Sequence, residues 1–315
     1  MNQSSNTSDQ SSAINDVGIT SSVRSDTSHS PRADDRHRLH HVPSPHGRIA
    51  VHEYAGSGAP LVLLHGFPDD SRIYDRLIPR LSGRHVVALD FVGYGASERK
   101  ETSVISSGQR ASEVMTVLDA LQLDSATVVG HDSGGPVAVD VALDSARVGK
   151  LVLLNSYYGR ETELRLPEMI QLFGDPRLAP LADAIIDDAG QRAWLLGHTA
   201  RRFGYDPDAP DSVRSRAIIP QFFGDTGQEH ARNAIRAWTR ALPRDLTEQT
   251  QRVKNGDLHR LSVPVTLAFG ADDNYLSPRL AVQIAAHFKS PRLHLIDGAS
   301  HWPQWDRPED VAKLL

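Results

Sequence analysis

The residues most able to do chemistry lie in the stretch Gly-His-Asp-Ser-Gly at 130–134. An apolar run with β-branched residues, 126–129, precedes this stretch and is typical of a strand. A segment with Pro136 near its first turn follows the stretch and is typical of a helix. The context therefore predicts a tight turn between a strand and a helix, which is where a nucleophile elbow presents its reactive side chain.

The two glycines of this stretch decide which residue is the nucleophile. A nucleophile on so sharp a turn needs small residues two positions before and after it, because a larger side chain there would clash with the strand or the helix. Gly130 and Gly134 stand at those positions for Asp132, whereas Ser133 would have the bulky His131 two positions before it. The spacing therefore predicts Asp132 as the nucleophile and argues against Ser133.

Three further segments with polar residues follow apolar runs that are typical of strands. Because the carboxyl ends of parallel strands meet at one edge of a sheet, we expect these segments to converge on the turn at 130–134. They would supply an acid and a histidine in the chain order nucleophile, acid, histidine, together with a backbone N–H next to the nucleophile. The segments are His65-Gly66-Phe67-Pro68, Gly270-Ala271-Asp272-Asp273 and Gly298-Ala299-Ser300-His301-Trp302.

Alternating strand and helix signals supply the elements that position these segments, and they predict an α/β fold with a mostly parallel sheet flanked by helices. The run 60–64 is apolar throughout, as expected for a strand buried on both faces of such a sheet. The predicted strands are 47–54, 60–64, 85–90, 126–129, 150–155, 263–269 and 292–296, and the predicted helices are 71–81, 108–121, 278–288 and 308–315.

The alternation of strand and helix signals gives way to helical signals after about residue 157. We therefore expect the chain to divide into four segments. Residues 1–36 are rich in Ser, Asp, Asn and Thr and lack aromatic residues, so we expect a disordered tail. The core would comprise 37–156 and 257–315, and 157–256 would form an inserted helical cap without strands. The prolines expected to break the helices of the cap are Pro176, Pro180, Pro207, Pro210, Pro220 and Pro243.

Composition argues against several function classes. The net charge of -5 and the scattered basic residues give no electrostatic case for nucleic acid. No run is apolar enough for a membrane helix and no secretory signal is evident, so we expect a cytoplasmic protein. No phosphate loop, dinucleotide fingerprint or metal-ligand spacing is present, and we expect neither cofactor nor metal. The histidine-containing segment 34–41 is expected to be a solvated polar stretch that enters the first strand.

Together with Asp-x-x-Gly-x-Gly-x-Ser at 90–97, these segments resemble the α/β-hydrolase fold family over nearly all of 37–315. His-Gly-Phe-Pro with an aspartate elbow is similar to the branch that contains epoxide hydrolases, haloalkane dehalogenases and fluoroacetate dehalogenases. The resemblance implies that Asp273, rather than Asp272, is the acid that orients His301. It also implies an oxyanion hole formed by the N–H groups of Phe67 and Ser133.

An aspartate nucleophile restricts the substrate on chemical grounds. Attack of a carboxylate on an ester or amide carbonyl would form a high-energy anhydride, whereas attack on an sp³ carbon with a strained or good leaving group forms an ordinary alkyl ester. Asp132 would thus displace an epoxide oxygen or a halide. His301, oriented by Asp273, would then activate the water that hydrolyses the ester.

The leaving-group pocket departs from each branch that the sequence resembles. Haloalkane dehalogenases generally have Asn and Trp where this chain has Phe67 and Ser133, and fluoroacetate dehalogenases have Arg at the latter position. Epoxide hydrolases use two cap tyrosines, one in a Tyr-Arg pair, where this chain has Thr239-Arg240. Tyr157, Tyr158 and Tyr205 are the remaining cap tyrosines, and each is either an acid or a packing residue.

Epoxide hydrolysis is the leading hypothesis, because one tyrosine can still supply its acid. Dehalogenation is the nearest enzymatic alternative, a non-catalytic small-ligand binding protein is the alternative from another class, and the elbow geometry argues against a serine esterase. We expect a small apolar substrate and a monomer or homodimer. The residues predicted to bind substrate are His65, Tyr158, Tyr205, Trp238 and Trp302.

Overall fold

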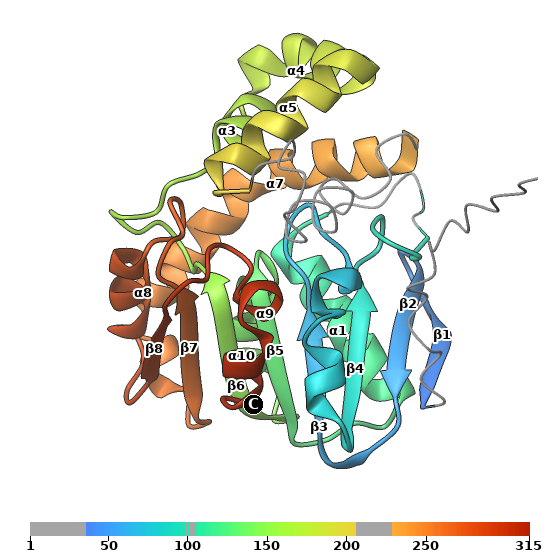
Figure 1. Cartoon of the computed structure of the whole chain (residues 1–315), viewed down its shortest axis with the longest axis vertical. Coiled ribbons are helices and arrows are strands. Elements are labelled where there is room, and N and C mark those ends of the chain that lie inside the picture. Colours follow the sequence, from blue (N-terminus) through green and yellow to red (C-terminus); the bar gives the residue numbers. More distant parts are fainter. Residues whose placement is uncertain (1–35, 99, 101–104, 206–228) are drawn as a thin grey trace, which may run out of the picture. The chain divides into compact units, whose positions relative to one another are not determined.

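The computed structural model describes residues 36–98, 100, 105–205 and 229–315. Eight strands form one sheet in the order β1-β2-β4-β3-β5-β6-β7-β8 (Figure 1). β1 and β2 pair antiparallel, as do β2 and β4, and every other neighbouring pair is parallel, which confirms the predicted mostly parallel sheet. The strands are β1 (His37–Ser44), β2 (Gly47–Tyr54), β3 (Ser57–Leu64), β4 (Arg84–Asp90), β5 (Ala126–Asp132), β6 (Val148–Ser156), β7 (Val265–Gly270) and β8 (Arg292–Ile296).

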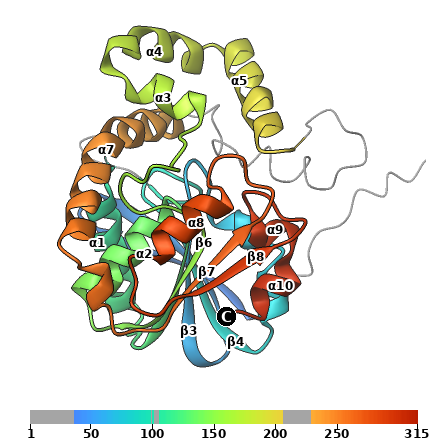
Figure 2. The same cartoon turned by 90° about the vertical axis from the view of Figure 1, so that its left-hand side faces the viewer.

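Helices cover both faces of the sheet (Figure 2). On one face lie α1 (Ser107–Ala120), α2 (Gly134–Asp144) and α8 (Pro278–Ala285). The other face carries the short helices η1 (Ser71–Tyr74), η2 (Ile78–Leu81), α9 (Pro303–Asp306) and α10 (Pro308–Ala312). Because both faces are covered, the central strands are buried along their length: each residue of Leu61–Leu64 in β3 is 0% exposed.

The described residues between β6 and β7, which we call the insert, contain helices joined by irregular segments and no strand. Figure 1 shows the insert beyond the edge of the sheet where the parallel strands end, which is the edge that carries the candidate site. Its described helices are α3 (Glu168–Gly174), η3 (Pro176–Leu178), α4 (Ala179–Asp187), α5 (Ala189–Arg202) and α7 (Glu229–Lys254), with η4 (Leu258–Arg260) following before β7.

The predicted proline breaks in this region are partly wrong. Pro243 lies inside α7, whose packed face, which includes Trp238 and Leu246, outweighs the one backbone hydrogen bond that a proline removes. Pro176 and Pro180 lie in the first turns of η3 and α4, where no N–H is needed. The other three, Pro207, Pro210 and Pro220, lie outside the described residues, as does the predicted tail 1–36 apart from Arg36.

Two predictions near the start of the core are corrected. The single helix predicted at 71–81 is instead η1 and η2, because Pro79 has no N–H to continue a helix from the preceding turn. The stretch 34–41, expected to be solvated and to enter the first strand, is mostly exposed where it is described, but its residues 37–41 already form the start of strand β1. There His37 stacks on Tyr54 with ring centres 4.8 Å apart, and His40 contacts Glu53 at 2.7 Å, so these histidines pack on the neighbouring strand.

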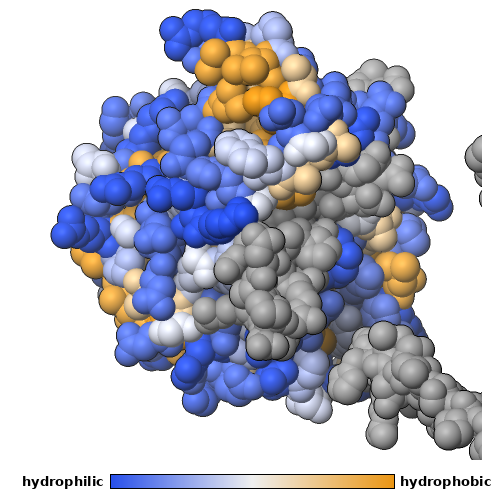
Figure 3. Space-filling model, turned by 45° about the horizontal axis from the view of Figure 1, so that its top comes forward, coloured by the Kyte–Doolittle hydropathy of each residue, from blue (hydrophilic) through white to orange (hydrophobic). Residues whose placement is uncertain are grey.

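The insert exposes apolar side chains to its surroundings. Figure 3 brings the face with the insert forward and shows hydrophobic surface there. The exposed large hydrophobic residues in the described part of the insert are Leu178, Leu181 and Trp194. Across the described residues, no helix is long and apolar enough to cross a bilayer.

Candidate active site

Asp132 occupies the tight turn between β5 and α2. Its φ of 47° lies in the left-handed region that side-chain-bearing residues rarely adopt. A Cβ at Gly130 would lie 2.5 Å from the carbonyl oxygen of Gly134, and a Cβ at Gly134 would lie 2.6 Å from that of His65. The turn therefore packs so closely that neither glycine can be replaced without a backbone shift, and it projects Asp132 from the edge of the sheet.

Backbone donors hold one side of the Asp132 carboxylate. The N–H of Phe67, in the loop after β3, donates to Oδ1 across 2.9 Å, and the N–H of Ser133 donates to the same carboxylate. These two N–H groups stabilise negative charge on the Asp132 carboxylate. The carboxylate is still partly accessible, with 14% of the side chain exposed.

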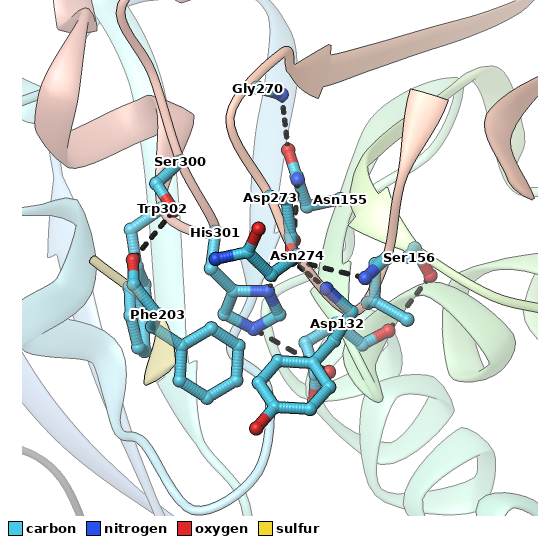
Figure 4. Close-up of polar contacts among 12 residues, drawn as sticks. Asp132, Asn155, Ser156, Phe203, Gly270, Asp273, Asn274, Ser300, His301 and Trp302 are labelled. Carbon is cyan, nitrogen blue, oxygen red and sulfur yellow. Dashed lines mark hydrogen bonds and ion pairs between the residues drawn. The ribbon is translucent and has the colours of Figure 1, made fainter. Parts of the chain in front are cut away.

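His301 faces Asp132 from the loop after β8. Its Nε2 lies 3.7 Å from Oδ2 of Asp132, and its Nδ1 lies 2.7 Å from Oδ2 of Asp273 (Figure 4). The short contact favours an Nδ1–H that donates to Asp273 and an Nε2 that can accept a proton. The longer contact exceeds hydrogen-bond distance, so His301 faces the Asp132 carboxylate without a hydrogen bond to it.

The acid Asp273 is fixed by donors from three residues besides His301. Its Oδ1 accepts the N–H of Tyr275 at 2.8 Å and that of Leu276 at 3.1 Å. Its Oδ2 accepts Nδ2 of Asn155 at 2.8 Å, and Oδ1 of Asn155 accepts the N–H of Gly270 at 2.7 Å (Figure 4). The Asn155 amide therefore links the ends of β6 and β7 and orients the carboxylate toward His301.

The same environment shifts the pKa values of the three groups in different directions. Burial raises the pKa of Asp132, although His301 and the N–H groups of Phe67 and Ser133 oppose that effect. Burial would also raise the pKa of Asp273, but the charge and hydrogen bond of His301 outweigh it, and this pKa is lowered. The pKa of His301 is raised despite burial, because Asp273 and Asp132 favour the imidazolium.

A cavity opens at Asp132 and His301 and is mostly apolar. Its walls come from the core loops and from the insert, so the two parts together enclose the reactive groups. The lining residues are Phe67, Pro68, Asp132, Tyr157, Arg165, Leu166, Pro167, Met169, Ile170, Thr199, Phe203, Trp238, Tyr275, Leu276, His301 and Trp302. Among the described residues, no group of three or more His, Asp or Glu side chains is placed to hold a metal ion.

Comparison with known proteins identifies the family of this chain. The family model described as "Alpha/beta hydrolase family" matches residues 61–314. The chain belongs to this family. A 2-hydroxy-6-oxononadienedioate/2-hydroxy-6-oxononatrienedioate hydrolase of Paraburkholderia xenovorans LB400 is 25% identical over 295 residues, which are 85% of this α/β hydrolase and 90% of the relative.

Two further comparisons fall in the branch that the sequence resembles. Haloalkane dehalogenase 2 of Mycobacterium bovis is 26% identical over 277 residues, which cover 86% of this chain and 91% of the relative. The solved structure of epoxide hydrolase CorEH without ligand matches with a TM-score of 0.69 at 22% identity and covers 88% of this chain and 96% of that chain. That likeness supports the α/β-hydrolase fold.

Only some of the predicted substrate-binding residues line the cavity of this α/β hydrolase. Trp238 and Trp302 do. His65 does not: it is 0% exposed, with Nδ1 against the Gly66 carbonyl at 2.7 Å and Nε2 accepting the Phe91 N–H at 3.0 Å. The prediction for His65 is therefore corrected to a structural role in the loop after β3.

The two tyrosines predicted to bind substrate also lie elsewhere. The Tyr158 hydroxyl donates to Oδ1 of Asp140 at 2.7 Å, and that of Tyr205 contacts Oδ2 of Asp306 at 3.0 Å. Neither tyrosine lines the cavity. Their hydroxyls find partners within the protein, as expected for buried tyrosines, and the sequence alone does not indicate which way either ring points.

The sequence left the roles of three candidate residues open, and the structure places each of them. Tyr157 lines the cavity, and its hydroxyl makes no hydrogen bond within the described part of the chain. Thr239 hydrogen-bonds the Ile235 carbonyl inside α7 and lies off the cavity, so the position compared with the family's Tyr-Arg pair supplies no acid. For the hydrogen bond between Asn155 and Asp273, the one signal in the sequence was that Asn155 stands at the end of a predicted strand.

A second buried carboxyl lies behind the catalytic candidates of this α/β hydrolase. Asp69 is 1% exposed, and its Oδ2 accepts the indole N–H of Trp302 at 2.9 Å. Its Oδ1 meets no donor among the described residues, and Nδ1 of His131 lies 3.9 Å from Oδ2. Burial raises the pKa of Asp69 to about 7.

Asp69→Asn should make the protein more stable at alkaline pH. The folded state holds a proton on Asp69 up to about pH 7, whereas the unfolded chain loses it near 3.8, so ionisation of Asp69 lowers stability as pH rises between these values. The free energy of unfolding of the variant, measured by urea titration, should exceed that of wild type by about 4 kcal/mol at pH 8 and converge with it near pH 4. The exposed Asp272→Asn is the matched control. Parallel pH curves for wild type and Asp69→Asn would contradict the assignment.

Proposed function

We propose that this α/β hydrolase converts an epoxide to a diol through a covalent alkyl ester on Asp132. The observation that carries the proposal is a carboxylate at the elbow, held by the N–H of Phe67 and faced by His301 at 3.7 Å. A carboxylate that attacks an sp³ carbon forms a stable ester, whereas attack on a carbonyl would form an anhydride. The inserted helices would act as a cap that keeps bulk water from the ester.

In the first step, Oδ2 of Asp132 attacks a carbon of the epoxide and the C–O bond to that carbon breaks. The ring oxygen leaves with the electron pair and takes a proton from the hydroxyl of Tyr157. Burial and the charge of Asp132 raise the pKa of Tyr157 well above its usual value, which keeps this hydroxyl protonated before the reaction. An apolar wall of aromatic side chains would hold the organic part of the substrate.

In the second step, Nε2 of His301 takes a proton from a water molecule, and the resulting hydroxide attacks the carbonyl carbon of the Asp132 ester. The negative oxygen of the tetrahedral intermediate is stabilised by the N–H groups of Phe67 and Ser133. The intermediate collapses, and the departing alkoxide takes the proton of the hydroxyl group that water added, which releases the diol and restores the Asp132 carboxylate. The proton on His301 returns to the tyrosinate through solvent. Asp273 stabilises the imidazolium while it exists.

Dehalogenation is the second candidate, and two observations favour it. The Mycobacterium bovis relative named haloalkane dehalogenase 2 covers most of the chain, and the Trp238 indole on the cavity wall could donate to a departing halide. This reaction would use the same ester and the same hydrolytic step. It would not need the proton of Tyr157, because halide leaves as an anion.

His301→Gln should trap the ester. Loss of the general base slows hydrolysis by about 10²–10⁴-fold and leaves alkylation by Asp132 intact. Intact-protein mass spectrometry should show an adduct equal to the whole substrate for an epoxide, or to the substrate without its halogen for a haloalkane. Asp132→Asn should form neither adduct. A His301→Gln variant that turns over normally, with no adduct on Asp132, would falsify the covalent mechanism.

Tyr157→Phe should distinguish the two reactions. Removal of the acid should slow ester formation with epoxides by about 10²-fold, and halide release from haloalkanes should stay within a few-fold of wild type. The measurement is the rate of adduct formation in the His301→Gln background with each substrate. Tyr158→Phe, whose hydroxyl bonds Asp140 away from the cavity, is the matched control. Equal epoxide rates for Tyr157→Phe and its parent would remove Tyr157 from the mechanism.

A further inference from the structure

Arg110 is a buried cation on the inner face of α1. It shares this face with the apolar residues Val114, Val117 and Leu118, and it is only 1% exposed. A cation so buried is expected to be paired with a carboxylate, because an unpaired charge in the interior is costly. Arg110 makes no ion pair with any residue that the structure describes.

The guanidinium uses one of its donors and leaves an edge free. Nη1 donates to Oγ of Ser133 across 3.1 Å, and Cζ lies 4.9 Å from the ring centre of Phe91 and 5.9 Å from that of Trp238. Nε and Nη2 are enclosed but meet no acceptor among the described residues. These two donors form one edge of the guanidinium, and their spacing matches the two oxygens of a carboxylate.

The nearby carboxyl groups do not pair with the free donors of Arg110. Glu113 accepts the Val92 N–H at 3.0 Å and Nε2 of Gln109 at 2.7 Å, and Asp245 accepts the Ser107 N–H at 2.8 Å. Burial raises the pKa of both carboxyls, that of Asp245 to about 6. Neither carboxyl hydrogen-bonds Arg110, so Nε and Nη2 of Arg110 remain available to a ligand.

Arg110 stands next to the nucleophile. Its partner Ser133 supplies one of the N–H groups that hold Asp132, and its neighbour Trp238 lines the cavity. Phe67, which supplies the other N–H, stacks on Trp238 with ring centres 3.9 Å apart. In the displacement, the leaving group departs from the side of the reacting carbon that is opposite Asp132. An anionic group of the substrate held near Ser133 would therefore be a substituent that does not react.

We propose that Arg110 binds a carboxylate of the substrate through Nε and Nη2. The enzyme would then act on small organic acids in which the reactive carbon lies close to the carboxylate. This inference rests on the proposed function and narrows the predicted small apolar substrate to an acid with an apolar body. Ser133, which is small where related enzymes carry a large residue, leaves room for Arg110 to approach the nucleophile from α1.

Trp238 controls access to this site. Trp238 lines the cavity and lies 5.9 Å from Cζ of Arg110, and Arg110 itself does not line the cavity. A carboxylate therefore reaches Arg110 when the Trp238 side chain turns aside. A second arginine, the exposed Arg165, lines the cavity and is the competing site for an anion, so it must be tested alongside Arg110.

The test measures carboxylate binding directly, on the full chain. Propionate is titrated against wild type by thermal unfolding and calorimetry, with propionamide as its neutral match. We expect propionate, and not propionamide, to bind wild type. Arg110→Gln should weaken propionate binding at least tenfold, and Arg110→Lys, which keeps the charge but loses the paired donors, should also weaken it. Arg165→Gln should bind as wild type does.

Each variant is compared by the shift in its unfolding temperature that propionate induces, so a change in basal stability does not affect the comparison. Arg110→Lys provides a second variant if Arg110→Gln does not fold. Unchanged propionate affinity in a folded Arg110 variant, loss in Arg165→Gln instead, or no binding to wild type would overturn the proposal. Alkylation of Asp132 by neutral epoxides in His301→Gln reports on the proposed function alone. The two ideas can therefore fail separately.

Discussion

The turn at Asp132 is the constraint on which the other parts of the site depend. A residue with a side chain is held at a φ of 47°, and the strain is tolerated because β5, α2 and the loop after β3 pack around two glycines at van der Waals limits. That packing brings the Phe67 N–H to the carboxylate and places Ser133 at the start of α2. The position of the Asp132 carboxylate and the backbone donors that hold it thus have one structural cause.

Buried charge is the second organising feature of the site. Asp132, Asp273 and Asp69 lie around one imidazole, and their surroundings push their pKa values apart: burial dominates for Asp132 and Asp69, whereas donors and His301 dominate for Asp273. A site with separated acid and base strengths is suited to successive proton transfers.

The sheet and the segments at its edge were predictable from the sequence, because apolar runs and glycine spacing are local signals. The residues that line the cavity were not predictable in this way. Tyr157 and Tyr158 are adjacent in sequence, yet only Tyr157 lines the cavity. Packing between distant segments decides such orientations. Arg110 was also missed, although an arginine on the apolar face of a predicted helix was a signal within the sequence. Pro243 shows the same limit, since tertiary packing overrides its local preference.

The most direct test of the account is the origin of the oxygen that enters the product. Enzyme in excess is allowed one turnover of an epoxide in heavy-oxygen water, and the product and the peptide containing Asp132 are analysed by mass spectrometry. A covalent ester predicts that the first product carries the unlabelled oxygen of Asp132 and that the heavy oxygen appears in the Asp132 carboxylate. Heavy oxygen in the first product, with none in Asp132, would show direct attack by water and contradict the account.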